Sequence, residues 1–187
     1  MDLNKIIQIV HHLLDRNGYR LNYTKLVKLL YLADREAWSR WDMAITKDRY
    51  ASLPQGPVLI DLYDLIKGSF ADRFAQTQWN SFFIKDGYDL VALHHHQLPV
   101  DELSPREMEL LHEIENRYRS WDFGKLIDLL HDRTKFPEWT DPGESALPLP
   151  PQDILRALGR SEEEIRQILD DEDTYRAEEE YLQKCCV

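Results

Sequence analysis

The chain has 187 residues, of which 43% are hydrophobic, so it is long enough to form one domain with a full core and a short appendage. Its formal net charge of −11 excludes a uniformly basic surface for DNA or RNA. The two cysteines, Cys185 and Cys186, are adjacent and form no disulfide framework. Because no signal peptide or membrane-length apolar run is visible, we expect a cytoplasmic protein without a membrane segment.

The first two predicted elements are helices. Apolar side chains recur at helical spacing over residues 2–17, and Asn17-Gly18 is typical of a helix end. A second helix is expected over about 22–40, with Asn22 as its N-cap. Its apolar stripe is too wide for a helix with one solvated face, so we place this helix at the centre of the core. The stripe consists of Leu26, Val27, Leu29, Leu30, Ala33, Ala37, Trp38 and Trp41.

The next segment mixes extended and helical patterns. Residues 45–53 alternate and contain Thr and Tyr, which favours a short strand. Pro57 fits the first position of a helix, where its missing N–H costs nothing, and this third helix is expected to end at Gly68. A short helical piece is expected within 69–77.

A β-hairpin is the strongest strand signal in the chain. Its predicted arms are 79–85 and 88–93, and Asp86-Gly87 supplies the two-residue turn. A lone hairpin is marginally stable in water. We therefore expect it either to pair with the 45–53 segment or to lie on the helices.

Helix-capping residues dominate the rest of the chain. Ser104, Pro105 and Glu107 form a capping box at the start of a helix, and another helix should follow from Phe123 to about Arg133. Residues 140–151 are a Pro-rich connector. After it, the pattern predicts a short helix over Pro151–Leu158 and a last helix capped by Ser161 with Glu164. The many acidic residues of the last helix indicate either a solvated helix or a docking surface for a basic partner.

These elements predict a fold of the α+β class. It is mainly α-helical with a small antiparallel β-hairpin or sheet, and a compact helical domain surrounds the central buried helix at about 22–40. The chain is divided into a main domain over 1–140 and a Pro-rich connector with an acidic helical segment over 141–187.

No pattern of residues predicts catalysis or a cofactor. His94, His95 and His96 are the one candidate for a metal site, since alternate residues of a strand face the same side and two imidazoles can bind zinc or nickel. A third ligand would have to come from Asp89, Asp101 or Glu102, none of which has a diagnostic spacing. Consecutive histidines are also common in exposed loops. We therefore expect no catalytic residues, no cofactor and no metal, and hence a protein that is not an enzyme.

A nucleic-acid-binding regulator is a weaker alternative. Two helices joined by Asn17-Gly18 resemble a helix-turn-helix motif, whose recognition helix needs basic residues that face the groove. The second helix carries Lys25, Lys28 and Arg35, but its many apolar residues favour burial over DNA contact.

Four segments of the chain resemble the SocA-like antitoxin family, also called the Panacea domain, which includes phage GepA-type proteins. Residues 24–33, TKLVKLLYLA, resemble its Lys-Leu-x-Lys-Leu-Leu-Tyr core helix. Gly56-Pro57-Val58 with Leu62-Tyr63 resembles its Gly-Pro-Val turn and helix, and the hairpin over 79–93 falls in the expected place. Leu126–His131 and Pro137-Glu138-Trp139 resemble its closing Leu-x-x-x-x-His and Pro-Trp motifs.

The resemblance covers about residues 3–140 and includes three departures from the family pattern. Val27 stands where Gln is common, and Glu138 is inserted in the Pro-Trp motif. Residues 52–55 replace an aromatic-bearing strand before the Gly-Pro turn, which affects the expected detail of this strand and of the partner surface.

The resemblance implies a non-enzymatic antitoxin that binds and neutralises a protein toxin encoded nearby. Family members pair with many unrelated toxins, and one also delivers its toxin to the ClpXP protease, so a ClpXP-type protease is a second possible partner. An interaction protein of phage or prophage origin without a cognate toxin is the alternative.

Aromatic side chains are the expected anchors of such a partner surface. The partner-binding candidates are Trp38, Trp41, Tyr50 and Trp79, and for each of them packing in the core is the other interpretation. Trp41 and Tyr50 border the connection between the second helix and the following strand, which favours them as surface residues.

Overall fold

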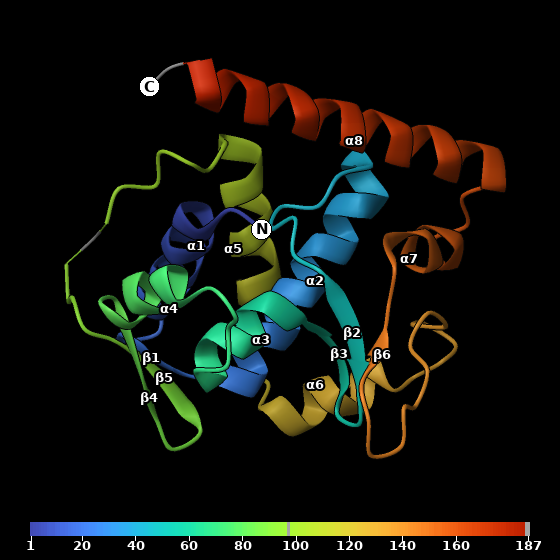
Figure 1. Ribbon diagram of the computed structural model, residues 1–187. Helices are drawn as coiled ribbons and strands as arrows, with labels where there is room; N and C mark the ends of the chain where they lie inside the picture. Colours follow the sequence, from blue (N-terminus) through green and yellow to red (C-terminus); the bar gives the residue numbers. More distant parts are fainter. Residues whose placement is uncertain (97, 186–187) are drawn as a thin grey trace.

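The computed structural model describes residues 1–96 and 98–185, so Cys186 of the cysteine pair lies outside the described residues. The helices are α1 (Leu3–Asp15), α2 (Tyr23–Trp41), α3 (Ile60–Lys67), α4 (Arg73–Asn80), α5 (Pro105–Tyr118), α6 (Phe123–Leu130), α7 (Pro151–Ala157) and α8 (Glu162–Cys185). The strands are β1 (Arg20–Asn22), β2 (Tyr50–Leu53), β3 (Gly56–Leu59), β4 (Phe83–Asp86), β5 (Asp89–Ala92) and β6 (Leu147–Pro148). They form two small antiparallel sheets, which confirms the predicted mainly helical α+β fold (Figure 1).

Helix α2 is the central element, as the sequence predicts. It passes through the middle of the molecule, and α5, α6, α7 and the β2–β3 hairpin lie around it (Figure 1). The Asn22 side chain caps its start by accepting a hydrogen bond from the Lys25 amide. Leu26, Leu30, Tyr31 and Ala37 are fully buried, so several faces of the helix are covered.

The predicted hairpin exists and lies against α1, α3 and α4, which is one of its two expected positions, but its turn was predicted wrongly. Strands β4 and β5 pair with Asp86 opposite Asp89, so the two-residue loop is Gly87-Tyr88. Gly87 has a φ of +61°, which glycine adopts without strain. The sheet is completed by β1 in the order β1-β5-β4, and not by the 45–53 segment. The first residues of the predicted arm, including Trp79, belong to α4.

The second sheet corrects the prediction for Pro57. Residues 56–59 form the edge strand β3, which pairs with β2 in the order β3-β2-β6, and α3 begins only at Ile60. Proline is tolerated in an edge strand, where a missing N–H removes no ladder bond. The start of α3 is capped by a distant side chain, because the Asp48 carboxylate accepts hydrogen bonds from the Asp61 and Leu62 amides at 3.0 Å.

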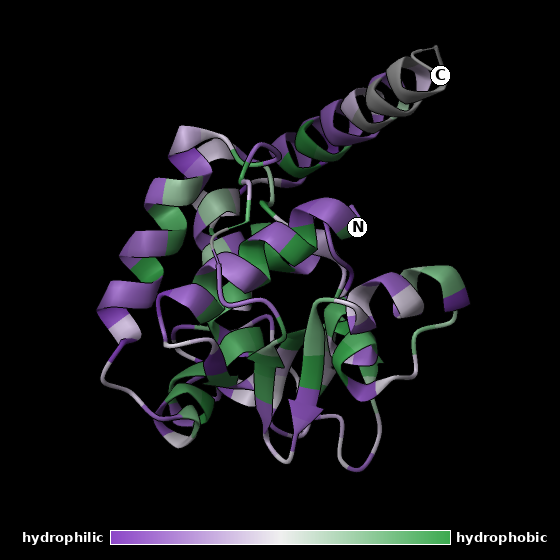
Figure 2. Ribbon diagram, turned by 90° about the vertical axis from the view of Figure 1, so that its left-hand side faces the viewer, coloured by the Kyte–Doolittle hydropathy of each residue, from purple (hydrophilic) through white to green (hydrophobic). Residues whose placement is uncertain are grey.

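The C-terminal part packs against the core. The capping box of Ser104 and Glu107 starts α5 as predicted, whereas α6 ends at Leu130, three residues earlier than expected. The connector contributes β6, which pairs with β2. Four apolar residues beyond 140 are buried in the same core as α2, namely Leu149, Ile154, Leu155 and Ile165. Helix α8 then extends away from the other elements towards the C-terminus (Figure 2).

Candidate protein-interaction site

Motif residues that are far apart in the sequence meet beside the start of α2. The Lys28 side chain is only 1% exposed, and its Nζ donates a hydrogen bond to the Pro57 carbonyl oxygen at 2.8 Å. Gly56 has a φ of +98°, and a Cβ at this position would lie 3.2 Å from Lys28 Nζ and 3.5 Å from the His131 ring. Glycine therefore serves both the backbone conformation and the close approach of the lysine.

The end of the family-like segment closes over this contact. The His131 ring stacks on Trp139 with their centroids 4.2 Å apart, and the Trp139 indole N–H donates to the Leu53 carbonyl oxygen at 3.2 Å. The Glu138 carboxylate is buried and accepts hydrogen bonds from the Tyr31 hydroxyl at 2.9 Å and from Arg35 Nε at 2.6 Å. The residue inserted in the Pro-Trp motif is thus an anchor between α2 and the chain after α6.

The polar side chains of this contact are largely buried and have few hydrogen-bond partners. Burial lowers the pKa of the Lys28 amine to about 7. Burial, followed by the nearby Lys28, also lowers the pKa of His131. Among the described residues, His131 Nε2 is a buried nitrogen without a hydrogen-bond partner.

Lys28 is one of the residues that line an open cavity of about 690 Å³, which we call the aromatic groove. Its walls come from the start of α2, the β2–β3 turn, α3, the β4–β5 loop and the first residue of α6. The lining residues are Asn22, Tyr23, Thr24, Val27, Lys28, Leu53, Pro54, Gln55, Val58, Tyr63, Lys67, Tyr88 and Phe123. The two charged residues among them are both lysines.

Four aromatic side chains line the groove, and two of them are strongly exposed. Tyr88 is 75% exposed and Phe123 is 46% exposed. The Tyr23 and Tyr88 rings stack with their centroids 6.3 Å apart, and Lys67 Nζ lies 4.6 Å from the Tyr23 ring centroid and 2.9 Å from its hydroxyl. Exposed aromatic rings beside a cation are typical of the anchor residues of protein interfaces.

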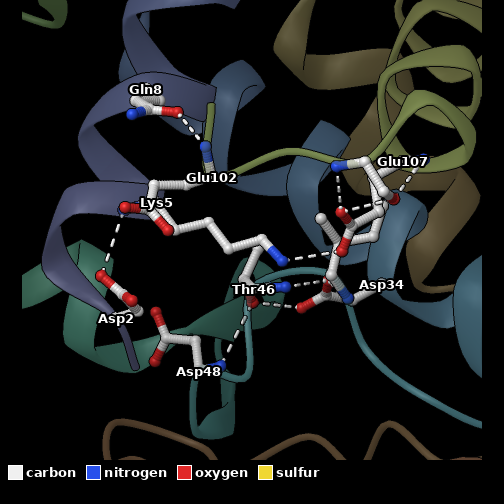
Figure 3. A network of polar contacts seen from close by, with 10 residues as sticks. Asp2, Lys5, Gln8, Asp34, Thr46, Asp48, Glu102 and Glu107 are labelled. Atoms are coloured by element: carbon white, nitrogen blue, oxygen red, sulfur yellow. Dashed lines mark hydrogen bonds and ion pairs between the residues drawn. The ribbon is translucent and has the colours of Figure 1, made fainter. Parts of the chain in front are cut away.

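A second cavity of about 770 Å³ lies between the β2 region and α8. The carboxylates near it serve the local backbone. Asp34 accepts hydrogen bonds from the Ile45 and Thr46 amides at 3.0 Å, from the Thr46 hydroxyl and from the Tyr50 hydroxyl, and burial raises its pKa to about 6 (Figure 3). Asp48, whose pKa burial raises to about 7, is the cap of α3. We therefore assign these carboxylates to the structure of the loop between α2 and β2.

The four partner-binding candidates from the sequence lie apart from the aromatic groove. Trp38 and Trp79 are 1% exposed and Tyr50 is 5% exposed, and the Trp38 indole N–H donates to the Tyr50 hydroxyl at 3.2 Å. All three are core residues, which agrees with the other interpretation of Trp38 and Trp79. The expectation that Tyr50 is a surface residue was wrong, because its hydroxyl donates to the buried Asp34 carboxylate at 3.0 Å. Trp41 is partly exposed, and the Arg106 guanidinium lies 4.9 Å from its ring centroid.

The sequence analysis missed the groove aromatics Tyr23, Tyr63, Tyr88 and Phe123. Tyr88 carried a usable signal, because a hairpin loop offers a large aromatic side chain little core to pack against. Phe123 is the first residue of α6, where an apolar side chain on the outer side is also unusual.

The three consecutive histidines make local contacts. His94 Nε2 and His95 Nε2 each lie 3.1 Å from a carbonyl oxygen, those of Ser81 and Ala92, and the His95 ring stacks on Tyr19. Within residues 1–96 and 98–185, no three or more His, Cys, Asp or Glu side chains are grouped as a metal ion would require. In the same described part, none of the helices combines the length and the apolar character needed to cross a membrane.

Comparison with known proteins links this geometry to a family. Residues 26–139 match the family model described as antitoxin SocA-like, Panacea domain, which is more than half of the chain. No curated protein and no solved structure gives a match. The matched segment spans the contacts from Lys28 to Trp139 and most of the aromatic groove. The chain therefore belongs to the SocA-like antitoxin family, the proteins of the Panacea domain.

Proposed function

We propose that this protein is a non-enzymatic antitoxin that binds a protein toxin encoded nearby and neutralises it through a surface that includes the aromatic groove. The observation that carries the proposal is the groove itself, which lies mainly within the family-matched segment and has two exposed aromatic side chains at its rim. A binding role of this kind needs no catalytic residue.

The dimensions and chemistry of the groove suit a segment of a protein partner. A volume of about 690 Å³ lies in the range of ligand pockets, and the apolar lining is combined with a few polar groups. Tyr88 and Phe123 can cover an apolar side chain of the partner while Asn22, Gln55 and Lys67 provide polar contacts at the edge.

Co-expression with the neighbouring gene, scored by recovery of growth, tests the proposal. We expect Tyr88→Ala and Phe123→Ala each to weaken binding by about 30-fold, as loss of an anchor worth about 2 kcal/mol would do, and to abolish the recovery together. Phe74→Ala is the matched control, because Phe74 is 79% exposed on α4 and does not line the groove. Full neutralisation by the double variant would refute the role of the groove.

The same assay separates two modes of neutralisation. Occlusion of the toxin would protect cells with or without a ClpXP-type protease, whereas delivery of the toxin for degradation would require the protease. Measuring the toxin level in the two strains distinguishes these modes, and a neighbouring gene that is harmless when expressed alone would favour the interaction protein without a cognate toxin.

A further inference from the structure

Lys28, which lines the aromatic groove, is a buried cation that has no anionic partner in the part of the chain that the structure describes. Lys28 Nζ has the Pro57 carbonyl as its hydrogen-bond acceptor among the described residues, and the pKa of the amine is changed by burial alone. Two other buried charged groups, by contrast, have an oppositely charged partner. Glu115 lies 2.9 Å from Arg16, and Glu138 lies 2.6 Å from Arg35. A buried ammonium with a single neutral acceptor is costly, and an anion would offset that cost.

The charge of the groove is opposite to that of the whole protein. Within the described part of the chain, its lining includes Lys28 and Lys67 and no acidic side chain, although the chain carries a formal net charge of −11. Lys85 also lies nearby, with Nζ 5.9 Å from the Tyr23 ring centroid. Such a local cationic site in an acidic protein favours an anionic group on the bound segment.

The aromatic lining specifies what must surround that anion. Tyr23, Tyr63, Tyr88 and Phe123 line the groove with their rings, and the buried Val27 and Val58 add to its apolar lining. An inorganic anion would leave these surfaces exposed to water. A peptide segment that combines an acidic side chain with apolar neighbours would cover the rings and reach the amine.

We propose that the aromatic groove binds an apolar segment of the partner protein that carries one Asp or Glu, whose carboxylate pairs with Lys28 while Lys67 attracts it at the rim. This inference rests on the proposed function of the groove. It adds the chemistry of the segment that the groove recognises.

Binding of this kind takes up protons in a defined pH range. The other titratable groups around Lys28 are His131 at the end of α6, Tyr63 and Lys67 on α3, Tyr23 on α2 and Tyr88 in the hairpin loop. Because burial lowers the pKa of Lys28 to about 7, the free protein loses this charge as the pH rises above about 7. A carboxylate beside it raises its pKa, so affinity should fall as the pH rises through this range.

Two short peptides test the inference without knowledge of the toxin. The first is acetyl-Leu-Phe-Glu-Phe-Leu-amide, and the second has Gln in place of Glu. We expect the Glu peptide to bind the full chain at least about tenfold more tightly at pH 7, as measured by NMR titration, because a charge-assisted hydrogen bond is worth about 1.5–3 kcal/mol. In Lys28→Met this preference should disappear, whereas Lys67→Met, an exposed substitution, should reduce it only a few-fold.

Several results would overturn the inference. Equal affinity of the two peptides for the unchanged protein, a preference that survives in Lys28→Met, or no binding of either peptide up to millimolar concentration would each do so. A leucyl-phenylalanine dipeptide with a free C-terminal carboxylate that alone binds tightly and depends on Lys28 would assign the site to a chain terminus instead. The growth assay with the Tyr88 and Phe123 variants is independent, so the proposed function can stand if this inference fails.

Discussion

The strongest prediction concerns the stability of Lys28→Met as a function of pH. Lys28 is almost completely buried, and burial lowers the pKa of its amine from 10.5 to about 7. The folded protein therefore binds fewer protons than the unfolded chain between about pH 7 and 10.5, and the contribution of this group to the free energy of unfolding rises with pH across that range. Methionine has a similar shape and no charge, so it removes this dependence.

The expected effect changes sign with pH. Lowering the pKa from 10.5 to about 7 corresponds to a cost of about 5 kcal/mol for the charged amine in the folded state. The substitution removes this cost and leaves the Pro57 carbonyl unpaired, which costs about 1–3 kcal/mol. We therefore expect Lys28→Met to be about 2 kcal/mol more stable than the unchanged protein at pH 7 and about 1 kcal/mol less stable at pH 10.

Urea unfolding at pH values from 7 to 10 measures this difference. The comparison of two proteins that differ at one position cancels the titration of the exposed lysines and tyrosines. Lys125→Met is the control, because Lys125 is exposed at the start of α6 and should show the same pH dependence as the unchanged protein. A stability difference that stays constant from pH 7 to pH 10 would refute the assignment of a near-neutral pKa to Lys28.

Two further predictions follow from the packing. Gly56→Ala should lower the free energy of unfolding by about 2 kcal/mol or more, because its φ is positive and the new Cβ would lie 3.2 Å from Lys28 Nζ. Gly68 also has a positive φ but open space around it, so Gly68→Ala should lower the free energy of unfolding by only about 1 kcal/mol. Equal losses in urea unfolding would contradict the role of the lysine. Deleting residues 176–187 should leave the thermal melting curve nearly unchanged, whereas deleting residues 146–187 should abolish cooperative unfolding. The longer deletion removes four buried side chains, each worth about 1.5–3 kcal/mol of burial, namely Leu149, Ile154, Leu155 and Ile165. A cooperative transition in the shorter chain would contradict this prediction.

The parts of the fold that depend on local signals were predictable from the sequence. Asn22 as the N-cap of α2 and the capping box of Ser104 and Glu107 involve residues three positions apart, so their effect is visible in a short window. The wide apolar stripe of α2 likewise placed it in the core, since a helix covered on several sides has no continuous polar face.

The errors arise where an element depends on contacts that are distant in the sequence. Pro57 fits a helix start locally, but pairing with β2 and the cap that Asp48 provides move the start of α3 to Ile60. Strand β1 has three residues and β6 has two, so neither shows a periodicity before its partner is known.

The candidate site was harder to predict for a related reason. Trp38 and Trp79 are the kind of residues that anchor interfaces, but their positions on α2 and α4 face the core. Tyr88 and Phe123 line the groove because a loop from one sheet and the start of α6 both border the same cavity as the start of α2. Residue type alone does not reveal that arrangement, because it is produced by the packing of elements far apart in the chain.

The division between buried motif residues and exposed groove residues has a consequence for recognition. Gly56, His131 and Trp139 hold the β2–β3 turn and the end of α6 together, so most changes there should lower the stability of the fold. Tyr88 and Phe123 make their contacts at the surface, where substitutions usually change stability by less than about 0.5 kcal/mol. The same frame can therefore carry different rims, and a protein built this way can change its partner without losing its fold.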